Sequence, residues 1–352
     1  MPSSLSTRRQ PRRWLPVAVG AAAVLGACAF VVHRQTRRVE RENPPKGRFV
    51  TAQGVRLHYT EHGAGDHTLV ILHGNGTTSE EMRLSPLLDQ AAERWRVLVF
   101  DRPGYGYSDA PKGRHWTAGE QADVVHAALQ ELGVHNPIVL GHSWGTMVAM
   151  NLGLRYPAAV GSLVLMSGYY FPSLRLDVAL MSQPALPLLG TLLRHTVSPL
   201  LGRLLWPVLR WRMFSPEPTT ESFRHDYPVW MSLRPSQLQA SATETALMIP
   251  SAFKLRSQYG SLRVPLVLVA GDKDRELSTR WHTERLHERI ADSVLHIVPG
   301  AGHMVHHVAP EEVVLAIEQA AEMAHGPRFT PRDVNAVMPP VNTTVDGSGA
   351  MT

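Results

Sequence analysis

The stretch 141–145, Gly-His-Ser-Trp-Gly, constrains the fold of this chain more than any other feature. An apolar run, Pro137–Leu140, precedes it, and a longer apolar segment, Thr146–Leu154, follows it. The first has the length and composition of a buried strand, and the second those of a helix. A glycine on each side of the serine allows the chain to turn sharply, because side chains there would crowd the bend. We therefore expect a strand–turn–helix that exposes the hydroxyl of Ser143.

Strands and helices alternate along the chain on both sides of this turn. Further buried strands are expected at Thr68–Leu72, Arg96–Phe100, Ser162–Met166, Val264–Ala270 and Ser293–Val298. Helices are expected at Gln121–Leu132, Thr279–Ile290 and Pro310–Met323. This alternation predicts an α/β fold with a doubly wound, mostly parallel sheet.

The sequence divides into three parts. Residues 1–48 combine a basic segment, an apolar run and a charged linker, and residues 49–324 contain the alternating strands and helices. Within this domain the alternation stops at about residues 169–260, which are rich in leucine, proline and tryptophan, so we expect a helical cap inserted there. Residues 325–352 are rich in proline, threonine and glycine and are expected to form a disordered tail.

The apolar run Trp14–Val32 contains no charged residue. As a helix it would span about 28 Å, close to the roughly 30 Å hydrocarbon core of a bilayer. We expect a single-pass membrane anchor. The second interpretation is a cleaved or lipidated signal, because residues 25–28 resemble a bacterial lipobox ending at Cys28, although the apolar run continues beyond that cysteine. A buried helix of a soluble protein is the third. Arginines flank the run on both sides, so the positive-inside rule does not assign an orientation.

Composition excludes some functions. The net charge is +5, and part of the excess is a cluster at Arg8, Arg9, Arg12 and Arg13 that we attribute to the membrane-flanking segment. The chain has no recognisable nucleic-acid-binding motif, so no nucleic-acid partner is expected. Its one cysteine allows no internal disulfide and no cysteine-based zinc site.

A serine nucleophile requires a base to take its proton and an acid to orient that base. Among the 18 histidines, His303 is the candidate base, because its glycine-rich loop lies between the last expected strand and the last helix, at the sheet edge of Ser143. Asp274 is the candidate acid, because it follows the strand that ends at Ala270 and keeps the order serine, aspartate, histidine. Asp272 in the same loop is the alternative.

Acyl transfer also requires hydrogen-bond donors for a developing oxyanion. The backbone N–H of Trp144 follows the serine at a helix start, and a second N–H is expected from Asn75, in the loop after the strand ending at Leu72. His73 in that loop is expected to brace it by hydrogen bonding rather than to act as a base.

The ordered motifs resemble those of the α/β-hydrolase superfamily over about residues 49–324. The resemblance rests on His73-Gly74, on Asp101-Arg102-Pro103-Gly104-Tyr105-Gly106-Tyr107-Ser108, on Gly141 to Gly145, on Gly271 to Asp274 and on Gly302-His303. Epoxide hydrolases and haloalkane dehalogenases with a similar pattern carry aspartate at the nucleophile position. Ser143 therefore favours a serine hydrolase, for which the resemblance implies no metal and no organic cofactor.

The expected function is cleavage of a carboxylic ester by a membrane-anchored serine hydrolase, with a lipid ester such as an acylglycerol as a candidate substrate. A proline-iminopeptidase-like enzyme, a carbon–carbon bond hydrolase and a non-catalytic binding or scaffold protein are the alternatives.

The cap sequence permits two interpretations. Residues 178–216 contain no acidic residue, and their leucines recur at helical spacing, although Pro207 is expected to kink or end a helix. An apolar cap face packing over the active site is one interpretation. A basic amphipathic surface that also lies on a membrane is the other.

Overall fold

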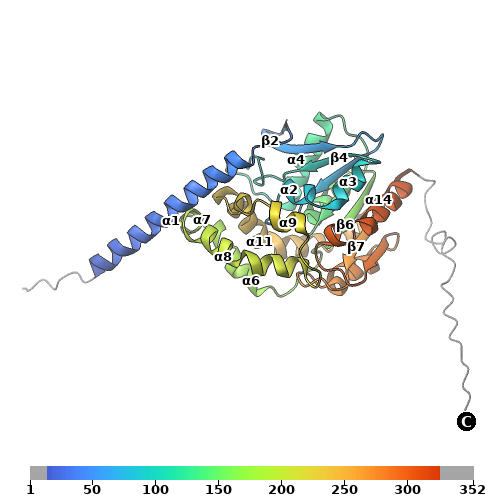
Figure 1. Ribbon diagram of the computed structural model, residues 1–352. Coiled ribbons are helices and arrows are strands. Elements are labelled where there is room, and N and C mark those ends of the chain that lie inside the picture. The colour runs from blue at the N-terminus through green and yellow to red at the C-terminus, as the bar shows by residue number, and fades with distance from the viewer. Residues whose placement is uncertain (1–13, 326–352) are drawn as a thin grey trace, which may run out of the picture.

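An eight-stranded sheet forms the centre of the structure, a computed structural model that describes residues 14–325 (Figure 1). The strands are β1 (Arg48–Ala52), β2 (Val55–His62), β3 (Thr68–Leu72), β4 (Arg96–Phe100), β5 (Ile138–His142), β6 (Ser162–Met166), β7 (Leu266–Gly271) and β8 (Val294–Val298). Their order is β1-β2-β4-β3-β5-β6-β7-β8. The pairs β1–β2 and β2–β4 are antiparallel, and all other neighbouring pairs are parallel. The predicted α/β fold is confirmed.

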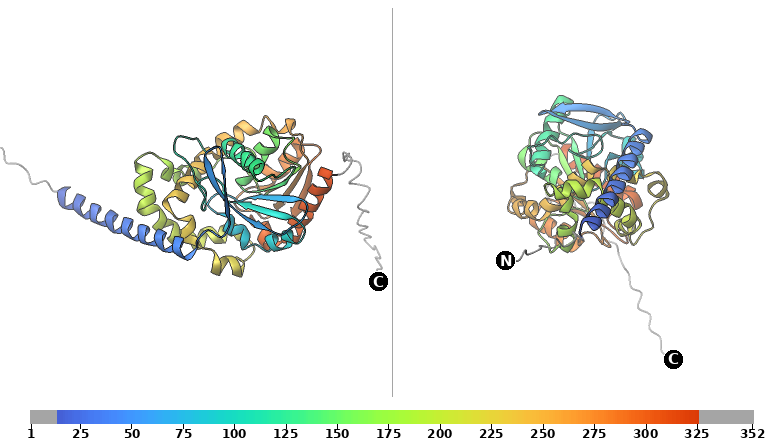
Figure 2. Two further views of the ribbon diagram at one scale, coloured as in Figure 1. Left: turned by 90° about the horizontal axis from the view of Figure 1, so that it is seen from above. Right: turned by 90° about the vertical axis from the view of Figure 1, so that its left-hand side faces the viewer.

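Helices cover both faces of the sheet (Figure 2). The helices of the α/β domain are α2 (Ser79–Arg83), α3 (Pro86–Ala92), α4 (Ala118–Glu131), α5 (Gly145–Arg155), α12 (Arg285–Arg289), α13 (Val305–Val308) and α14 (Pro310–His325). Strand residues alternate between two cores: Val70 and Leu72 face the core that includes α4 and α5, and Leu69 and Ile71 face the core that includes α3 and α14. This two-sided burial explains why the central strands are mostly continuous apolar runs and do not alternate between apolar and polar residues.

The cap lies between β6 and β7, where the sequence suggests an insertion. Its helices are α6 (Leu176–Met181), α7 (Leu189–His195), α8 (Val197–Phe214), α9 (Glu221–Asp226), α10 (Val229–Ser232) and α11 (Pro235–Leu255). Pro207 does not end a helix, because α8 continues through it to Phe214. Pro207 has no N–H to donate to the carbonyl of Arg203, four residues earlier. Arg203 lies on the exposed side of α8, so water can replace the missing hydrogen bond.

The N-terminal helix α1 (Trp14–Glu42) is longer than the sequence analysis expects. The expected linker begins at residue 33, but the chain is helical for ten more residues, and these pack against the cap: Val39 is buried, and Glu40 accepts a hydrogen bond from Arg234 at 3.1 Å. Tertiary contacts therefore stabilise a segment that looks like a solvated linker. The arginines at positions 8–13 and the tail 326–352 lie outside the described residues.

Within the described residues, one helix has a stretch, Pro16–Glu42, that is long and apolar enough to cross a membrane by length and composition. The most apolar part of this stretch is almost entirely unburied by the rest of the protein. An anchor and a signal sequence both have these properties.

The turn between β5 and α5 leaves no room for a side chain at Gly145. A β-carbon there would lie 2.3 Å from the carbonyl oxygen of Leu72, at the end of the neighbouring strand β3. The glycine therefore lets α5 begin directly against the sheet.

We predict that Gly145→Ala destabilises the protein by about 3 kcal/mol, because the backbone must shift to relieve this overlap. Guanidinium unfolding of the detergent-solubilised chain, followed by tryptophan fluorescence, measures the change. Gly260→Ala is the matched control: its β-carbon would meet nothing within 4 Å, and we expect a change within about 0.5 kcal/mol. Equal effects of both substitutions would contradict this account of the turn.

Candidate active site

Ser143 occupies the turn between β5 and α5 in a strained conformation. Its φ angle is +52°, in the left-handed region that non-glycine residues rarely adopt. The backbone holds it there: its N–H donates to the carbonyl of Met166 at 2.9 Å, and its carbonyl accepts from the hydroxyl and the N–H of Thr146. Such strain, maintained by surrounding hydrogen bonds, is characteristic of functional turns.

His303 and Asp274 form a buried pair at the same edge of the sheet. The Nδ1 of His303 lies 2.7 Å from Oδ2 of Asp274. The other carboxylate oxygen of Asp274 accepts from the N–H groups of Glu276 and Leu277, at 2.7 and 3.0 Å. Burial alone would lower the pKa of His303, but the charge of Asp274 and its hydrogen bond outweigh burial, so the pKa is raised.

Asp272, the alternative acid, makes a different contact. It is exposed, and its carboxylate accepts a hydrogen bond from the N–H of Gly300 at 2.7 Å. It therefore braces the loop that leads to His303, while Asp274 is the acid that contacts the imidazole.

His142, the residue before Ser143, connects the serine turn to this pair. The imidazole of His142 donates from Nε2 to the carbonyl of His303 at 3.2 Å, and the two rings are 5.0 Å apart. Within residues 14–325, however, the Ser143 hydroxyl makes no hydrogen bond, so the expected serine–histidine contact is open in this structure. Nucleophile–base contacts in unliganded sites are commonly loose and tighten when substrate binds.

The two expected oxyanion donors are unused. In the described part of the chain, neither the N–H of Asn75 nor that of Trp144 donates a hydrogen bond. Trp144 also precedes the first turn of α5, where the helix dipole favours negative charge. Both groups are therefore free to donate to a substrate.

His73 braces the loop that carries Asn75, as predicted. It donates from Nδ1 to the carbonyl of Gly74 at 2.8 Å and accepts at Nε2 from the N–H of Arg102 at 3.1 Å. Burial, reinforced by the charge of Arg102, lowers the pKa of His73 to about 3, so the ring is neutral near pH 7.

A second buried cluster, which the sequence analysis missed, lies behind His303. Glu81 accepts at one oxygen from Nε2 of His306 and Nε2 of His307, at 2.5 and 2.8 Å. One donor atom from each of Glu81, His142 and His306 lies within 4.8 Å of the others, and two imidazoles with a carboxylate are a set that could hold a metal ion. We assign the cluster a bracing role, because the hydrogen bonds of Glu81 fix α13, and with it the His303 loop, to α2.

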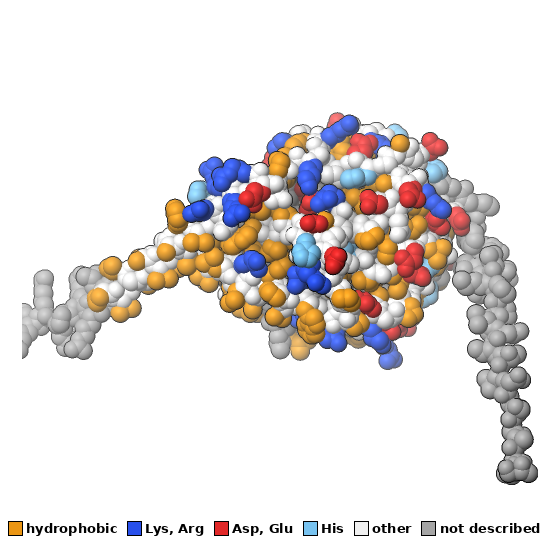
Figure 3. Space-filling model, viewed as in Figure 1, with side chains coloured by type: hydrophobic (Ala, Val, Ile, Leu, Met, Phe, Trp, Pro, Cys, Tyr) orange, Lys and Arg blue, Asp and Glu red, His pale blue; other side chains and the backbone are white. Residues whose placement is uncertain are grey.

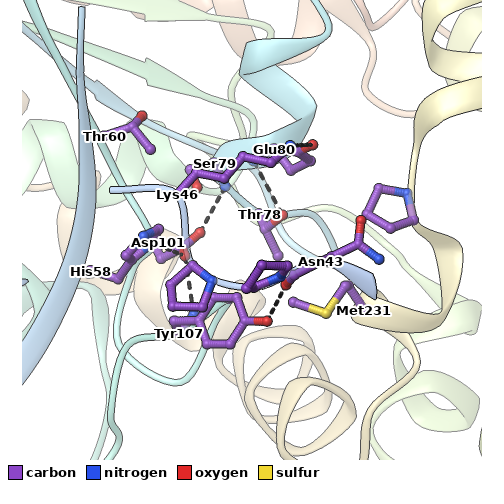
Figure 4. A pocket seen from close by; sticks show the side chains of 14 residues that line it. Asn43, Lys46, His58, Thr60, Thr78, Ser79, Glu80, Asp101, Tyr107 and Met231 are labelled. Carbon is purple, nitrogen blue, oxygen red and sulfur yellow. Dashed lines mark hydrogen bonds and ion pairs between the residues drawn. The ribbon is translucent and has the colours of Figure 1, made fainter. Parts of the chain in front are cut away.

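A small cavity of about 40 Å³ lies elsewhere, where the end of α1 meets the α/β domain (Figure 4). Its lining includes Asn43, His58, Asp101 and Tyr107, but none of the triad candidates. The imidazole of His58 is 2.7 Å from a carboxylate oxygen of Asp101, which also accepts from the N–H of Tyr107. The space suits one or two water molecules, so we interpret this cavity as a packing gap between α1 and the α/β domain and not as a substrate site.

We predict that Asp274→Asn lowers the pKa of His303. In the native protein the carboxylate raises this pKa above the usual 6.5; without its charge, burial prevails. Histidine ¹⁵N NMR titration, with His303→Gln to assign the resonance, measures the shift. Asp272→Asn is the control and should leave the pKa unchanged, and a larger shift in this control than in Asp274→Asn would reverse our assignment.

Comparison with known proteins places these residues in a family context. The model of the alpha/beta hydrolase family matches residues 69–317. The human mesoderm-specific transcript homolog protein is 30% identical over 177 residues, covering 47% of this chain and 52% of that protein. A 2-hydroxy-6-oxononadienedioate/2-hydroxy-6-oxononatrienedioate hydrolase from Paraburkholderia phymatum is 37% identical over 116 residues, 32% of this chain and 40% of that enzyme. The chain thus spans about half or less of the length of these two relatives.

Solved structures agree on the fold. The crystal structure of a membrane phospholipase A matches with a TM-score of 0.61 and 22% identity, covering 90% of this chain and all of that one. The enol-lactonase from Burkholderia xenovorans matches with a TM-score of 0.62 and 17% identity, covering 78% of this chain and 99% of that one. The family match covers most of the chain, including Ser143, Asp274 and His303, and so this protein belongs to the alpha/beta hydrolase family.

Proposed function

We propose that the protein is a serine hydrolase that cleaves a carboxylic ester through an acyl-serine intermediate. One observation carries the proposal: Ser143 is held in a strained turn next to the unused N–H of Trp144, and its neighbour His142 contacts the backbone of His303, whose imidazole is paired with a buried carboxylate. These are the parts that serine acyl transfer requires.

The proposed reaction has two stages, acylation of the serine and deacylation. Ser143 Oγ attacks the ester carbonyl, and its proton passes to Nε2 of His303, because Nδ1 faces Asp274. The N–H groups of Asn75 and Trp144 donate to the oxyanion. His303 then protonates the leaving alcohol, and a water molecule, activated by the same base, releases the acid from the serine.

A lipid ester is the proposed substrate class because of the surface around the cap. Exposed apolar side chains share one side of α8, at Leu201, Leu204, Leu205, Val208 and Trp211. The helix α1 contacts α7, α8 and α10, and apolar side chains are dense along α1 and on the adjoining part of the body (Figure 3). A cap attached to an apolar anchor in this way would lie close to the bilayer, where a lipid ester could reach the site.

Cleavage of a carbon–carbon bond is the second candidate. It is favoured by the Paraburkholderia relative, whose name denotes a hydrolase of a dienedioate. An iminopeptidase-like activity and a non-catalytic role are further outcomes of the tests below.

We predict that Ser143→Ala abolishes both hydrolysis of p-nitrophenyl esters and labelling by a fluorophosphonate probe, because both need the serine oxygen. The losses are measured by absorbance and by in-gel fluorescence. Ser167→Ala is the matched control: Ser167 also follows a parallel strand with a positive φ, yet we assign it no catalytic role.

Retained turnover in Ser143→Ala would refute the nucleophile, and absence of labelling in the folded native protein would favour a binding protein. Competition of labelling by glycerides, dienedioates and proline amides separates the enzymatic candidates.

We predict that Leu204→Asp slows hydrolysis of an ester embedded in vesicles about tenfold. The rate of hydrolysis of a soluble short-chain ester should be unchanged. Leu204 is 74% exposed, so the substitution removes an apolar contact with lipid without disturbing the core. Leu315→Asp on α14 is the control, because Leu315 is also exposed, at 48%, but lies outside the cap. Equal rates for both variants on vesicles would contradict a membrane-facing cap.

A further inference from the structure

One turn of the cap helix α11 contacts the loop that carries the oxyanion donor Asn75. The side-chain amide of Asn75 donates to Thr245 Oγ1 at 3.0 Å and to the carbonyl of Ser241 at 3.3 Å. Its side-chain oxygen accepts from the hydroxyl of Tyr105 at 2.8 Å. All of the polar atoms of this side chain are thus used to fix the position of its own backbone.

The preceding residues of the loop are held to the same turn of α11. Glu244 is buried and pairs with Arg102, which is fully buried. The guanidinium of Arg102 also donates to the carbonyls of His73 and Gly74, at 2.8 and 2.9 Å. Glu244 therefore holds, through Arg102, the two residues that come before Asn75.

The second oxyanion residue is connected to this turn as well. The indole N–H of Trp144 donates to the backbone carbonyl of Glu244 at 3.2 Å. Residues 241–245 of the cap therefore contact both sides of the expected oxyanion hole.

The loop needs such external support. It contains Gly74, and it contains Gly76 with a φ of +75°, so its own backbone preferences leave its conformation weakly defined. A donor must point at the position that the oxyanion will occupy, and that alignment contributes mainly in the transition state.

We propose that the 241–245 turn of the cap positions the oxyanion hole, with Thr245 as the positioning residue for Asn75. This proposal rests on the proposed acyl-transfer function. It assigns the cap a part in the chemical step in addition to covering the site. Loss of the Thr245 hydroxyl lets the Asn75 backbone move, so the oxyanion is stabilised less while binding of the ground-state ester is little changed.

The test compares Thr245→Val with Thr243→Val in the full-length protein. Both threonines donate to the carbonyl four residues earlier in α11, at 2.9 and 2.8 Å, but only Thr245 accepts from Asn75. We expect Thr245→Val to lower kcat for a p-nitrophenyl ester about tenfold, less than the 10²–10³ of deleting an oxyanion donor. KM should stay within about twofold, because ground-state binding does not use the oxyanion contact. Thr243→Val should change neither constant.

A second readout separates positioning from a merely structural role. Inhibition by a trifluoromethyl ketone, which forms a tetrahedral oxyanion adduct with a serine, should weaken about tenfold in Thr245→Val and in proportion to kcat. Thr245→Ser keeps the hydroxyl and should restore both values. Thr245→Ala replaces the valine variant if the latter does not fold.

The outcomes of this proposal and of the proposed function are distinct. If the native protein is active and Thr245→Val matches Thr243→Val, or if KM rises while kcat is unchanged, positioning by the cap is wrong. If the folded native protein neither turns over esters nor reacts with the fluorophosphonate, the proposed function fails, and this inference fails with it.

Discussion

The close approach of β5, α5 and β3 is the constraint on which the rest of the structure depends. Helix α5 starts immediately after the buried strand β5, and its first residue lies against the end of the adjacent strand β3. This arrangement requires glycine at both sides of the bend. It also requires the residue between them to adopt a left-handed conformation. That residue is a serine, and its position at the carboxyl edge of a parallel sheet brings it to the loops after β7 and β8. The packing that builds the sheet thus also determines where chemistry can occur.

Buried charges connect the remaining parts to this edge. Arg102 and Glu244 join the sheet to the cap, and Glu81 joins α2 to the histidines that follow the His303 loop. Removing one partner of a buried pair leaves an uncompensated charge, which costs about 3–5 kcal/mol. Because breaking such a pair is costly, these contacts tie distant segments of the chain to this edge of the sheet.

Much of this could be predicted from the sequence because the signals are local. Strands such as Thr68–Leu72 are short apolar runs beside glycine-rich loops, and the turn at Ser143 has its own five-residue pattern. The sequence favours Asp274 over Asp272 without excluding Asp272, because both follow the same strand, and the folded loop shows that Asp274 is the one that faces His303. Residues 33–42 resemble a solvated linker for a similar reason: their helix packs against a cap roughly two hundred residues later, which no local pattern shows. The contacts of Asn75 with Thr245 and of Arg102 with Glu244 join positions 170 and 142 residues apart, beyond any local pattern.

The length of α1 has a consequence for how the protein would search for substrate. In the proposed anchored form, the apolar run occupies the bilayer, and the ten helical residues beyond it extend about 15 Å without a break. Because these residues are packed against the cap, they form a rigid connection between the apolar run and the α/β domain, not a flexible linker. The α/β domain would then stay at a fixed distance and a fixed angle from the lipid headgroups. It would meet its substrate by lateral diffusion in the plane of the membrane.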